Sequence, residues 1–363
     1  MSPATLSSFV VAAATLSLVA AQSTYPATPL AQKTFAYPNG IPYQADTDPG
    51  LIRGGQFGYN ICNSTTEGQT SNCQTNIFNG IDDFCLWAPP EPNSVVANTE
   101  GEMVAWCTKP GHGTRLIPEG ALQGVQWIRT PDYIQAAGYI DQSFVNLQGD
   151  DYGGEMDPHG ADLRGNPLGG LVYTNAWSGS ATSYGQAFEW HNFIGSNFFC
   201  FKACDPSRPN AANYCQHIYD RIGCTYNAPT NVVNGTFEVC DGDSQDFPGV
   251  YTENGVVMTY TQPPESLGPI STMPYTAKIP ASSNCVPHAS TDLYAALASV
   301  HAPAASGASS AAHSGATTAH ASGSASKTGS AGAPANTNAN AASSVTFSAI
   351  SLVGSIVAAI YLS

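Results

Sequence analysis

The stretch QAFEWHNFIGSNFFCFKAC, residues 186–204, is rich in strand-forming residues. It mixes aromatic and β-branched residues with partial alternation, and turn-forming residues bound it, a pattern typical of β-strands. The segments EMVAWCT, GVQWIR and GGLVYTNAW share this character, whereas helical character is confined to AANYCQHIYDRIG and STDLYAALASV. We therefore predict a mainly β fold: a single disulfide-stapled antiparallel sandwich or jelly-roll-like ectodomain with long loops, over residues 41–290.

Composition narrows the class of partner. The formal net charge is −15, only 10% of residues are charged, and the chain holds 35 Gly and 26 Pro. Nucleic acids and anionic polysaccharides are bound through basic stripes, so this charge disfavours both as partners. The many glycines and prolines favour strands, turns and long ordered loops over a helical bundle.

The first residues have the features of a secretory signal peptide, which we assign to residues 1–21. An apolar stretch runs from Phe9 to Val19, and Val19 and Ala21 fit the −3 and −1 positions of a cleavage site. Cleavage there leaves a mature chain that begins near Gln22, with residues 22–40 as an N-terminal extension. The protein is therefore expected to be secreted.

Cysteine usage agrees with secretion. All ten cysteines follow the predicted cleavage site, and an even set in a secreted chain predicts a disulfide framework. They cluster as four and then six, but the pairing within each group stays open. No C-x-x-C pair is present, so the zinc-ribbon and thioredoxin signatures are missing. The predicted disulfide cysteines are Cys62, Cys73, Cys85, Cys107, Cys200, Cys204, Cys215, Cys224, Cys240 and Cys285.

The C-terminal part is predicted to be a stalk followed by a lipid-attachment signal. Residues 291–344 are rich in Ser, Thr, Ala and Gly, a composition typical of a disordered, O-glycosylated stalk. Residues 345–363 form an apolar tail, and with the polar spacer they match a glycosylphosphatidylinositol (GPI) signal, with Asn336 as the expected attachment residue. The alternative is a retained membrane span. Sequons at Asn63 and Asn234 predict N-glycosylation of exposed segments.

The densest polar cluster is GDDYGGEMDPHGAD, residues 149–162. Its carboxylates and imidazole make Asp151, Asp157 and His159 candidates for metal binding, and make Glu155 and Asp157 candidates for an acid/base pair in glycoside hydrolysis. The alternative is structural, because glycines and Pro158 mark a turn-rich loop, and loops use Asp to bond their own backbone. We predict no cofactor.

Searches for other catalytic motifs are negative. The sequence contains neither a G-x-S-x-G nucleophile elbow nor an H-E-x-x-H zinc motif. Five Trp and 17 Tyr offer aromatic faces on which sugar rings stack, although most aromatic side chains of a β protein serve its core.

Several strings resemble the fungal family named macrofage activating glycoprotein. They are PDYIQAAGYID, GGEMDPHGAD followed by GNPLGGLVY, EWHNFIGSNFFCFKACDP and YCQHIYDRIGCTYNAP, and the likeness covers about residues 40–290. The last two strings, with four cysteines in fixed spacing, are the most specific. The resemblance implies a secreted or wall-associated fungal mannoprotein, and it brings no catalytic residues with it.

Together these features predict a fungal glycoprotein of the cell surface or cell wall with a structural, adhesive or host-interaction role. The expected location is the extracellular face of the plasma membrane or the wall, with the membrane reached only through the lipid. Wall polysaccharide or a host surface receptor is the expected partner. The alternative is a GPI-anchored glycosidase or transglycosylase that uses Glu155 and Asp157.

Overall fold

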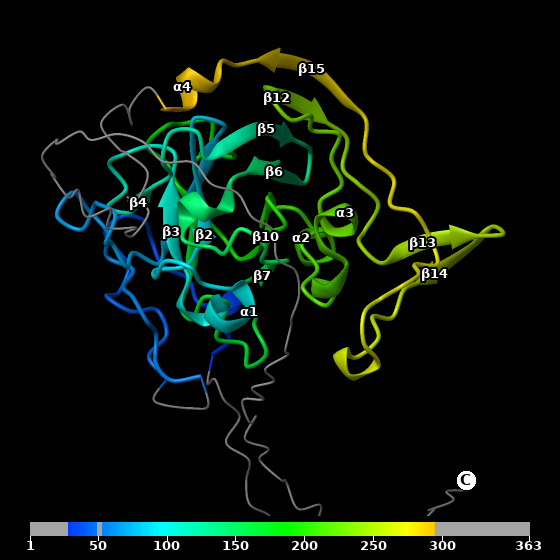
Figure 1. The fold of residues 1–363 in the computed structure, drawn as a ribbon, viewed down its shortest axis with the longest axis horizontal. Coiled ribbons are helices and arrows are strands. Elements are labelled where there is room, and N and C mark those ends of the chain that lie inside the picture. The colour runs from blue at the N-terminus through cyan, green and yellow to red at the C-terminus, as the bar shows by residue number, and fades with distance from the viewer. Residues whose placement is uncertain (1–27, 49–52, 295–363) are drawn as a thin grey trace, which may run out of the picture. The chain divides into compact units, whose positions relative to one another are not determined.

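The computed structural model describes residues 28–48 and 53–294. The predicted signal peptide, the apolar tail, Asn336 and most of the predicted stalk lie outside the described residues. Within them the chain is mainly β, with only short helices, which confirms the predicted fold class (Figure 1). None of the helices described is both long enough and apolar enough to cross a membrane.

One sheet has six strands, in the order β4-β3-β2-β1-β8-β9. Its central strands are mostly buried, and β2 and β3 are accordingly largely apolar on both faces, whereas β1 also buries the polar residues Thr75 and Asn76. The pairs β1/β8 and β3/β4 are parallel, and the other pairs are antiparallel. The strands are β1 (Thr75–Gly80), β2 (Asp83–Ala88), β3 (Val104–Cys107), β4 (Arg115–Leu116), β8 (Leu171–Thr174) and β9 (Gly185–Ala187).

A second sheet has seven strands, in the order β15-β12-β5-β6-β11-β10-β7. Residues 186–204, quoted at the start, form β9 and the hairpin of β10 and β11, which turns at Ser196 and Asn197. Only β5 and β12 pair in parallel, so both sheets are mixed rather than wholly antiparallel. The strands are β5 (Leu122–Arg129), β6 (Tyr133–Ile140), β7 (Gly154–Met156), β10 (Glu189–Gly195), β11 (Phe198–Cys204), β12 (Phe237–Gly242) and β15 (Ser282–Pro287).

Aromatic side chains join the two sheets into a sandwich. Phe78 of β1 lies with its ring centroid 4.3 Å from that of Phe201 and 4.5 Å from that of Trp127, both on the seven-stranded sheet. Trp87 of β2 packs on Trp190 of β10 with 5.8 Å between ring centroids. Burying these large rings between the sheets supplies much of the hydrophobic stabilisation of the fold.

All ten cysteines pair, and the two sequence groups close internally. Two of these bonds, made by Cys200 and Cys204, fix the segment that follows β11 to the seven-stranded sheet, which matters for the site below. The pairs are Cys62–Cys73, Cys85–Cys107, Cys200–Cys224, Cys204–Cys215 and Cys240–Cys285.

The helices lie before the first strand, in the connections between strands and at the C-terminal end of the described residues. The predicted helical segment AANYCQHIYDRIG forms only the short helices α2 and η4 and the first residue of α3, and of STDLYAALASV the described part forms α4. The α-helices are α1 (Val96–Thr99), α2 (Ala211–Tyr214), α3 (Gly223–Asn227) and α4 (Ser290–Tyr294), and the 3-10 helices are η1 (Leu30–Gln32), η2 (Glu100–Glu102), η3 (Gln142–Val145), η4 (Asp220–Ile222) and η5 (Glu265–Leu267).

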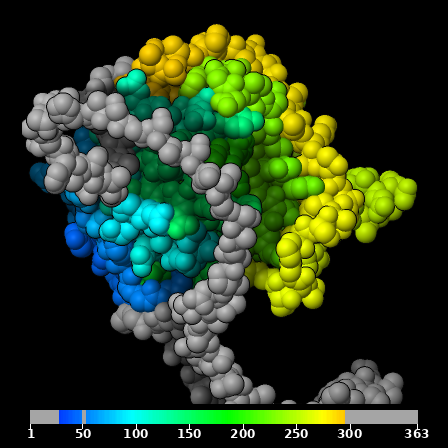
Figure 2. Space-filling view, in the orientation of Figure 1, coloured from blue at the N-terminus to red at the C-terminus, as the bar shows by residue number. Residues whose placement is uncertain are grey.

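A separate two-stranded hairpin, β13 (Val250–Glu253) and β14 (Val256–Thr259), projects from the sandwich at the right of Figures 1 and 2. Its turn is Asn254-Gly255, and both residues have positive φ, as the tight hairpin turn requires. Val256 and Val257 on this hairpin remain 59% and 68% exposed. The hairpin is therefore exposed on the surface and does not contribute to the hydrophobic core.

Candidate functional site

Residues 154–156 of the predicted acidic segment 149–162 form β7, and the acidic loop that follows this strand closes on itself. Asp157 and Asn166 exchange backbone hydrogen bonds of 2.9 and 2.8 Å. The Asp157 carboxylate accepts bonds from the amides of His159 and Gly160, at 2.7 and 2.8 Å. Asp157 therefore holds the turn that presents His159, in agreement with the structural interpretation of this loop.

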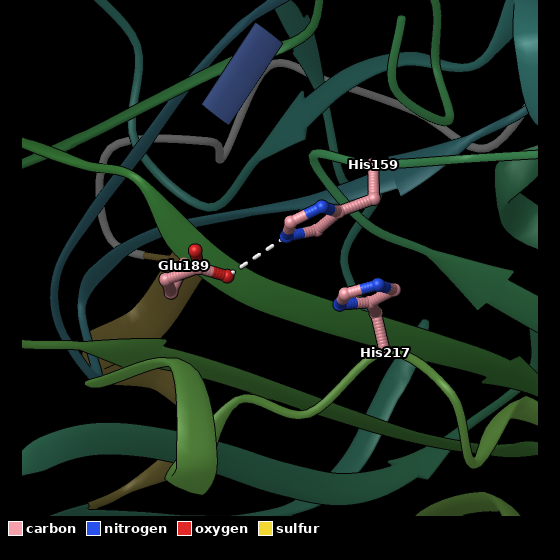
Figure 3. A group of neighbouring side chains, drawn as sticks. All are labelled: His159, Glu189 and His217. Atoms are coloured by element: carbon pink, nitrogen blue, oxygen red, sulfur yellow. Dashed lines mark hydrogen bonds and ion pairs between the residues drawn. The ribbon is translucent and has the colours of Figure 1, made fainter. Parts of the chain in front are cut away.

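His159 lies beside a carboxylate and a second imidazole (Figure 3). Its Nε2 is 2.9 Å from Oε2 of Glu189, the first residue of β10. The ring of His217 stacks on that of His159, with 3.6 Å between centroids and 11° between planes. One ligand atom from each of these three side chains lies within 4.8 Å of the others, so the group has the composition and spacing of a metal site.

Strand pairing and a disulfide bring the three residues together. Glu189 is the register partner of Cys204 on β11, and Cys204 is bonded to Cys215. His217 follows Cys215 by two residues, so the disulfide places it next to Glu189. Its position therefore depends on covalent and backbone constraints rather than on side-chain packing alone.

The two imidazoles differ in their affinity for a proton. Burial lowers the pKa of His159, but the hydrogen bond and the charge of Glu189 outweigh it, and the pKa lies above its ordinary value. Burial, together with the charge of His159, lowers the pKa of His217 to about 4. The stack therefore pairs a neutral imidazole with one that Glu189 favours in the protonated form.

Two further carboxyl groups near this site are largely buried. Burial, followed by the charges of Asp157 and Asp220, raises the pKa of Glu100 to about 7. Burial also raises the pKa of Glu155 well above its ordinary range, with Asp157 adding to the effect. Glu100 and Glu155 therefore retain their protons at a higher pH than ordinary carboxyl groups do.

Glu155, a candidate acid/base residue, is enclosed by the fold. Its side chain is 3% exposed, and its Oε1 lies 3.9 Å from Nδ1 of the fully buried His191. Burial raises the pKa of Glu155, and burial together with the Lys202 charge lowers that of His191, so the two groups face each other in neutral form. No hydrogen-bond partner for either side chain is found among the described residues. A sugar at the surface does not reach this carboxyl group in the present conformation.

The remaining candidate residues lie elsewhere. The Asp151 carboxylate accepts a bond of 2.9 Å from the backbone amide of Val96, at the start of α1. It is not part of the histidine group. Asn63 and Asn234 are exposed, as carriers of N-linked sugars must be.

A second candidate site is an aromatic groove at the base of the β13–β14 hairpin. It has a volume of about 650 Å³. Tyr251 stacks on Tyr275, with 4.8 Å between centroids and 3° between planes, and the Tyr226 ring meets Tyr275 edge-on. Polar and charged side chains of both signs stand among these rings. We call this the aromatic groove; its aromatic residues are Tyr214, Tyr226, Phe247, Tyr251 and Tyr275.

Sequence reasoning found His159 but missed Glu189, His217 and Glu100. The signals were present in part, because Glu189 and His217 lie in the two strings with fixed cysteine spacing, and His217 follows Cys215 by two residues. The groove was missed because nothing in the sequence separates exposed tyrosines from core ones. The hairpin that forms one of its walls has an Asn-Gly turn signal in the sequence, but this signal predicts the hairpin and not the groove beside it.

Fold and site together define a disulfide-linked β-sandwich protein with a histidine–carboxylate group and an aromatic groove. The chain is 42% identical to appressorium protein ROW2 of Mycosarcoma maydis over 224 residues, which cover 60% of this chain and 74% of ROW2. It is 48% identical to appressorium protein ROW1 of the same organism over 200 residues, 54% of this chain and 46% of ROW1. The chain belongs to the family of these fungal appressorium proteins, and the match spans less than half the length of ROW1. No family model and no solved structure matches it.

Proposed function

We propose that this chain is a glycoprotein of the fungal cell surface that binds neutral polysaccharide of the fungal or host wall through the aromatic groove. Both relatives are named appressorium proteins of a fungus, which supports a role at the cell surface or in host interaction. The observation that carries the binding function is the aromatic groove itself.

Sequence features support display outside the cell. Five disulfides suit an oxidising compartment, and both sequon asparagines are exposed. A Ser/Thr-rich stalk of residues 291–344 and an apolar tail of residues 345–363 fit O-glycosylation and GPI attachment at Asn336. The resemblance to the macrofage activating glycoproteins, which are secreted or wall-associated, points the same way.

The chemistry of the aromatic groove suits an uncharged sugar chain. Half-buried tyrosine rings offer flat apolar faces to a pyranose, and phenol and amide groups supply hydrogen bonds to its hydroxyls. Asp246, Glu253 and Lys278 line the same groove, so its charge is mixed. With a net charge of −15, the chain would repel an acidic polymer. The expected ligands are therefore uncharged polysaccharides, namely glucan, chitin, mannan or cellulose.

Replacing Tyr251 by alanine is expected to weaken polysaccharide binding by about tenfold, which corresponds to ~1.4 kcal/mol. The substitution removes one ring of the stacked pair that forms the groove wall. Binding is measured by pull-down on insoluble glucan, chitin, mannan and cellulose, and by calorimetry with their soluble oligomers. The matched control is Tyr152→Ala, because Tyr152 is 91% exposed and lies outside the groove. The proposal is overturned if the parent binds none of these polymers, or if both variants lose binding equally.

Phosphatidylinositol-specific phospholipase C is expected to release the protein from protoplast membranes, because a GPI lipid is the predicted membrane attachment. Release is followed by immunoblotting of the supernatant, with an untreated sample as control. Retention in the membrane, together with detection of a peptide from residues 345–363 by mass spectrometry, would refute lipid attachment and favour a retained span.

A further inference from the structure

We propose that His159, Glu189 and His217 bind a divalent transition-metal ion of the zinc class. This site is independent of the polysaccharide proposal, since none of its ligands lines the aromatic groove. Two imidazoles and one carboxylate, with a fourth position left for water, form a donor set that zinc accepts in proteins. Imidazole nitrogen is a poor ligand for calcium and magnesium, which take oxygen ligands.

The distances between the three donor atoms are close to those of a coordinated ion, so a small rearrangement of the side chains is enough to bind one. Two donor atoms bound to one tetrahedral ion at ~2.0–2.1 Å are about 3.3 Å apart. In the structure, the donors of His159 and Glu189 are 2.9 Å apart, and all three donors lie within 4.8 Å. The parallel imidazoles need a rotation of one ring, since an ion lies in the plane of each imidazole that binds it.

The surroundings of His217 favour a ligand role over a structural one. Among the described residues, its ring nitrogens have no hydrogen-bond partner, and its ring contact is the stack on His159. One nitrogen of each ring is directed toward the side on which Glu189 lies (Figure 3). A half-buried imidazole that makes no hydrogen bond is positioned to accept an ion.

The charge and the access of the site also suit a cation. Glu189 contributes a carboxylate as a ligand, and Asp157 lies two residues from His159 in the same loop. The side chains of His159 and Glu189 are 16% and 19% exposed, so an ion and a water molecule reach them from solvent. A metal site needs a path for the ion to enter and negative charge that partly neutralises the ion, and both are present here.

The backbone holds the three ligands on separate segments that are already fixed. The turn held by Asp157 fixes the position of His159, strand β10 fixes that of Glu189, and the Cys204–Cys215 disulfide fixes that of His217. Binding of the ion therefore needs little further ordering of the backbone. An ion that binds only the folded state also stabilises it by mass action, so occupancy raises the melting temperature.

The test uses the mature full-length chain, secreted without a histidine tag, stripped with EDTA and titrated with ZnCl₂. We expect one equivalent of Zn²⁺ to bind by calorimetry and to raise the melting temperature, and CaCl₂ to do neither. Co²⁺ in place of Zn²⁺ is expected to give the intense visible absorption of a four-coordinate ion. His217→Ala should weaken Zn²⁺ binding by about 100-fold or more, and Glu189→Gln, which preserves side-chain size, should act in the same direction.

The matched control is His112→Ala. His112 also pairs with a carboxylate, since its Nε2 is 2.6 Å from Oδ1 of Asp83, but it belongs to no group of three donors in the described part of the chain. This variant should bind one equivalent of Zn²⁺ as the parent does. The proposal is overturned if the parent fails to reach saturation, or if folded His217→Ala and Glu189→Gln bind Zn²⁺ as tightly as the parent.

Discussion

Replacement of Arg164 by methionine is expected to lower the free energy of unfolding by about 3–5 kcal/mol, because it leaves a buried carboxylate without its cation. The side chains of Arg164 and Asp46 are 0% and 1% exposed. The guanidinium donates to both carboxylate oxygens of Asp46 and to the carbonyl of Gly54, the last at 2.7 Å. Arg164 thereby ties the acidic loop to the N-terminal segment.

Urea unfolding at constant pH measures the effect, and an unchanged slope in denaturant shows that the compactness of the two states is the same. The matched control is Arg208→Met. Arg208 pairs with Asp205 at 3.7 Å and is 52% exposed, so this variant is expected to change stability by no more than about 0.5 kcal/mol. In the double variant Asp46→Asn/Arg164→Met, part of the loss should return, because no charge is then left unpaired. Equal effects of Arg164→Met and Arg208→Met would contradict the prediction.

The strands of this protein were predictable because their residues carry the signal themselves. EMVAWCT contains β3, GVQWIR lies in β5, GGLVYTNAW contains β8, and residues 186–204 hold most of β9 and all of β10 and β11. Aromatic and branched side chains in short runs pack well only on a pleated surface. Sheet order was not predictable, because the parallel pairs β1/β8 and β5/β12 join segments far apart in sequence.

The candidate site was predictable only for the residues that share one loop. Asp157 and His159 stand together in the acidic string, so composition alone selected them. Glu189 reaches His159 through strand register, and His217 reaches it through the Cys204–Cys215 bond. Neither register nor disulfide pairing follows from residue types, because each is decided by which chain segments bury their apolar faces together.

The burial of Glu155 shows a second limit of sequence reasoning. Its position two residues from Asp157 suggested a pair of carboxyl groups for catalysis, yet β7 ends at Met156, between the two residues, so their side chains have different surroundings. Glu155, on β7 opposite Phe193, points into the interior, while Asp157 bonds the amides of its own loop. Residues two apart on one continuous strand share a face, and a strand of only three residues is too short for the sequence pattern to show that it ends between them.

Glu100 is expected to make the protein less stable as pH rises from about 4.5 to about 7. Burial and the charges of Asp157, Asp220 and Glu265 raise its pKa to about 7 from 4.5, against the opposing charge of Arg53. Between these values the folded state holds a proton that the unfolded state has released. Stability due to this proton is therefore complete below the unfolded pKa and is lost as pH rises through the folded one. The difference amounts to at most about 3 kcal/mol.

Glu100→Gln isolates this effect, because the amide keeps an oxygen for the 3.1 Å bond from Asn166 Nδ2 and binds no proton. Near pH 4.5 the variant and the parent should unfold alike, and above pH 7 the variant should be the more stable by up to about 3 kcal/mol. Urea unfolding across this range, with EDTA present so that metal binding does not contribute, gives both curves. Glu155 and the other shifted groups remain in both proteins, so the difference between the curves reports the Glu100 carboxyl group together with its charge interaction with Glu155. Glu102→Gln, an exposed change on the same 3-10 helix, should follow the parent at every pH. Parallel curves for Glu100→Gln and the parent would show that the Glu100 carboxyl group is already ionised in the folded state near pH 5, and that the fold hydrates it despite its burial.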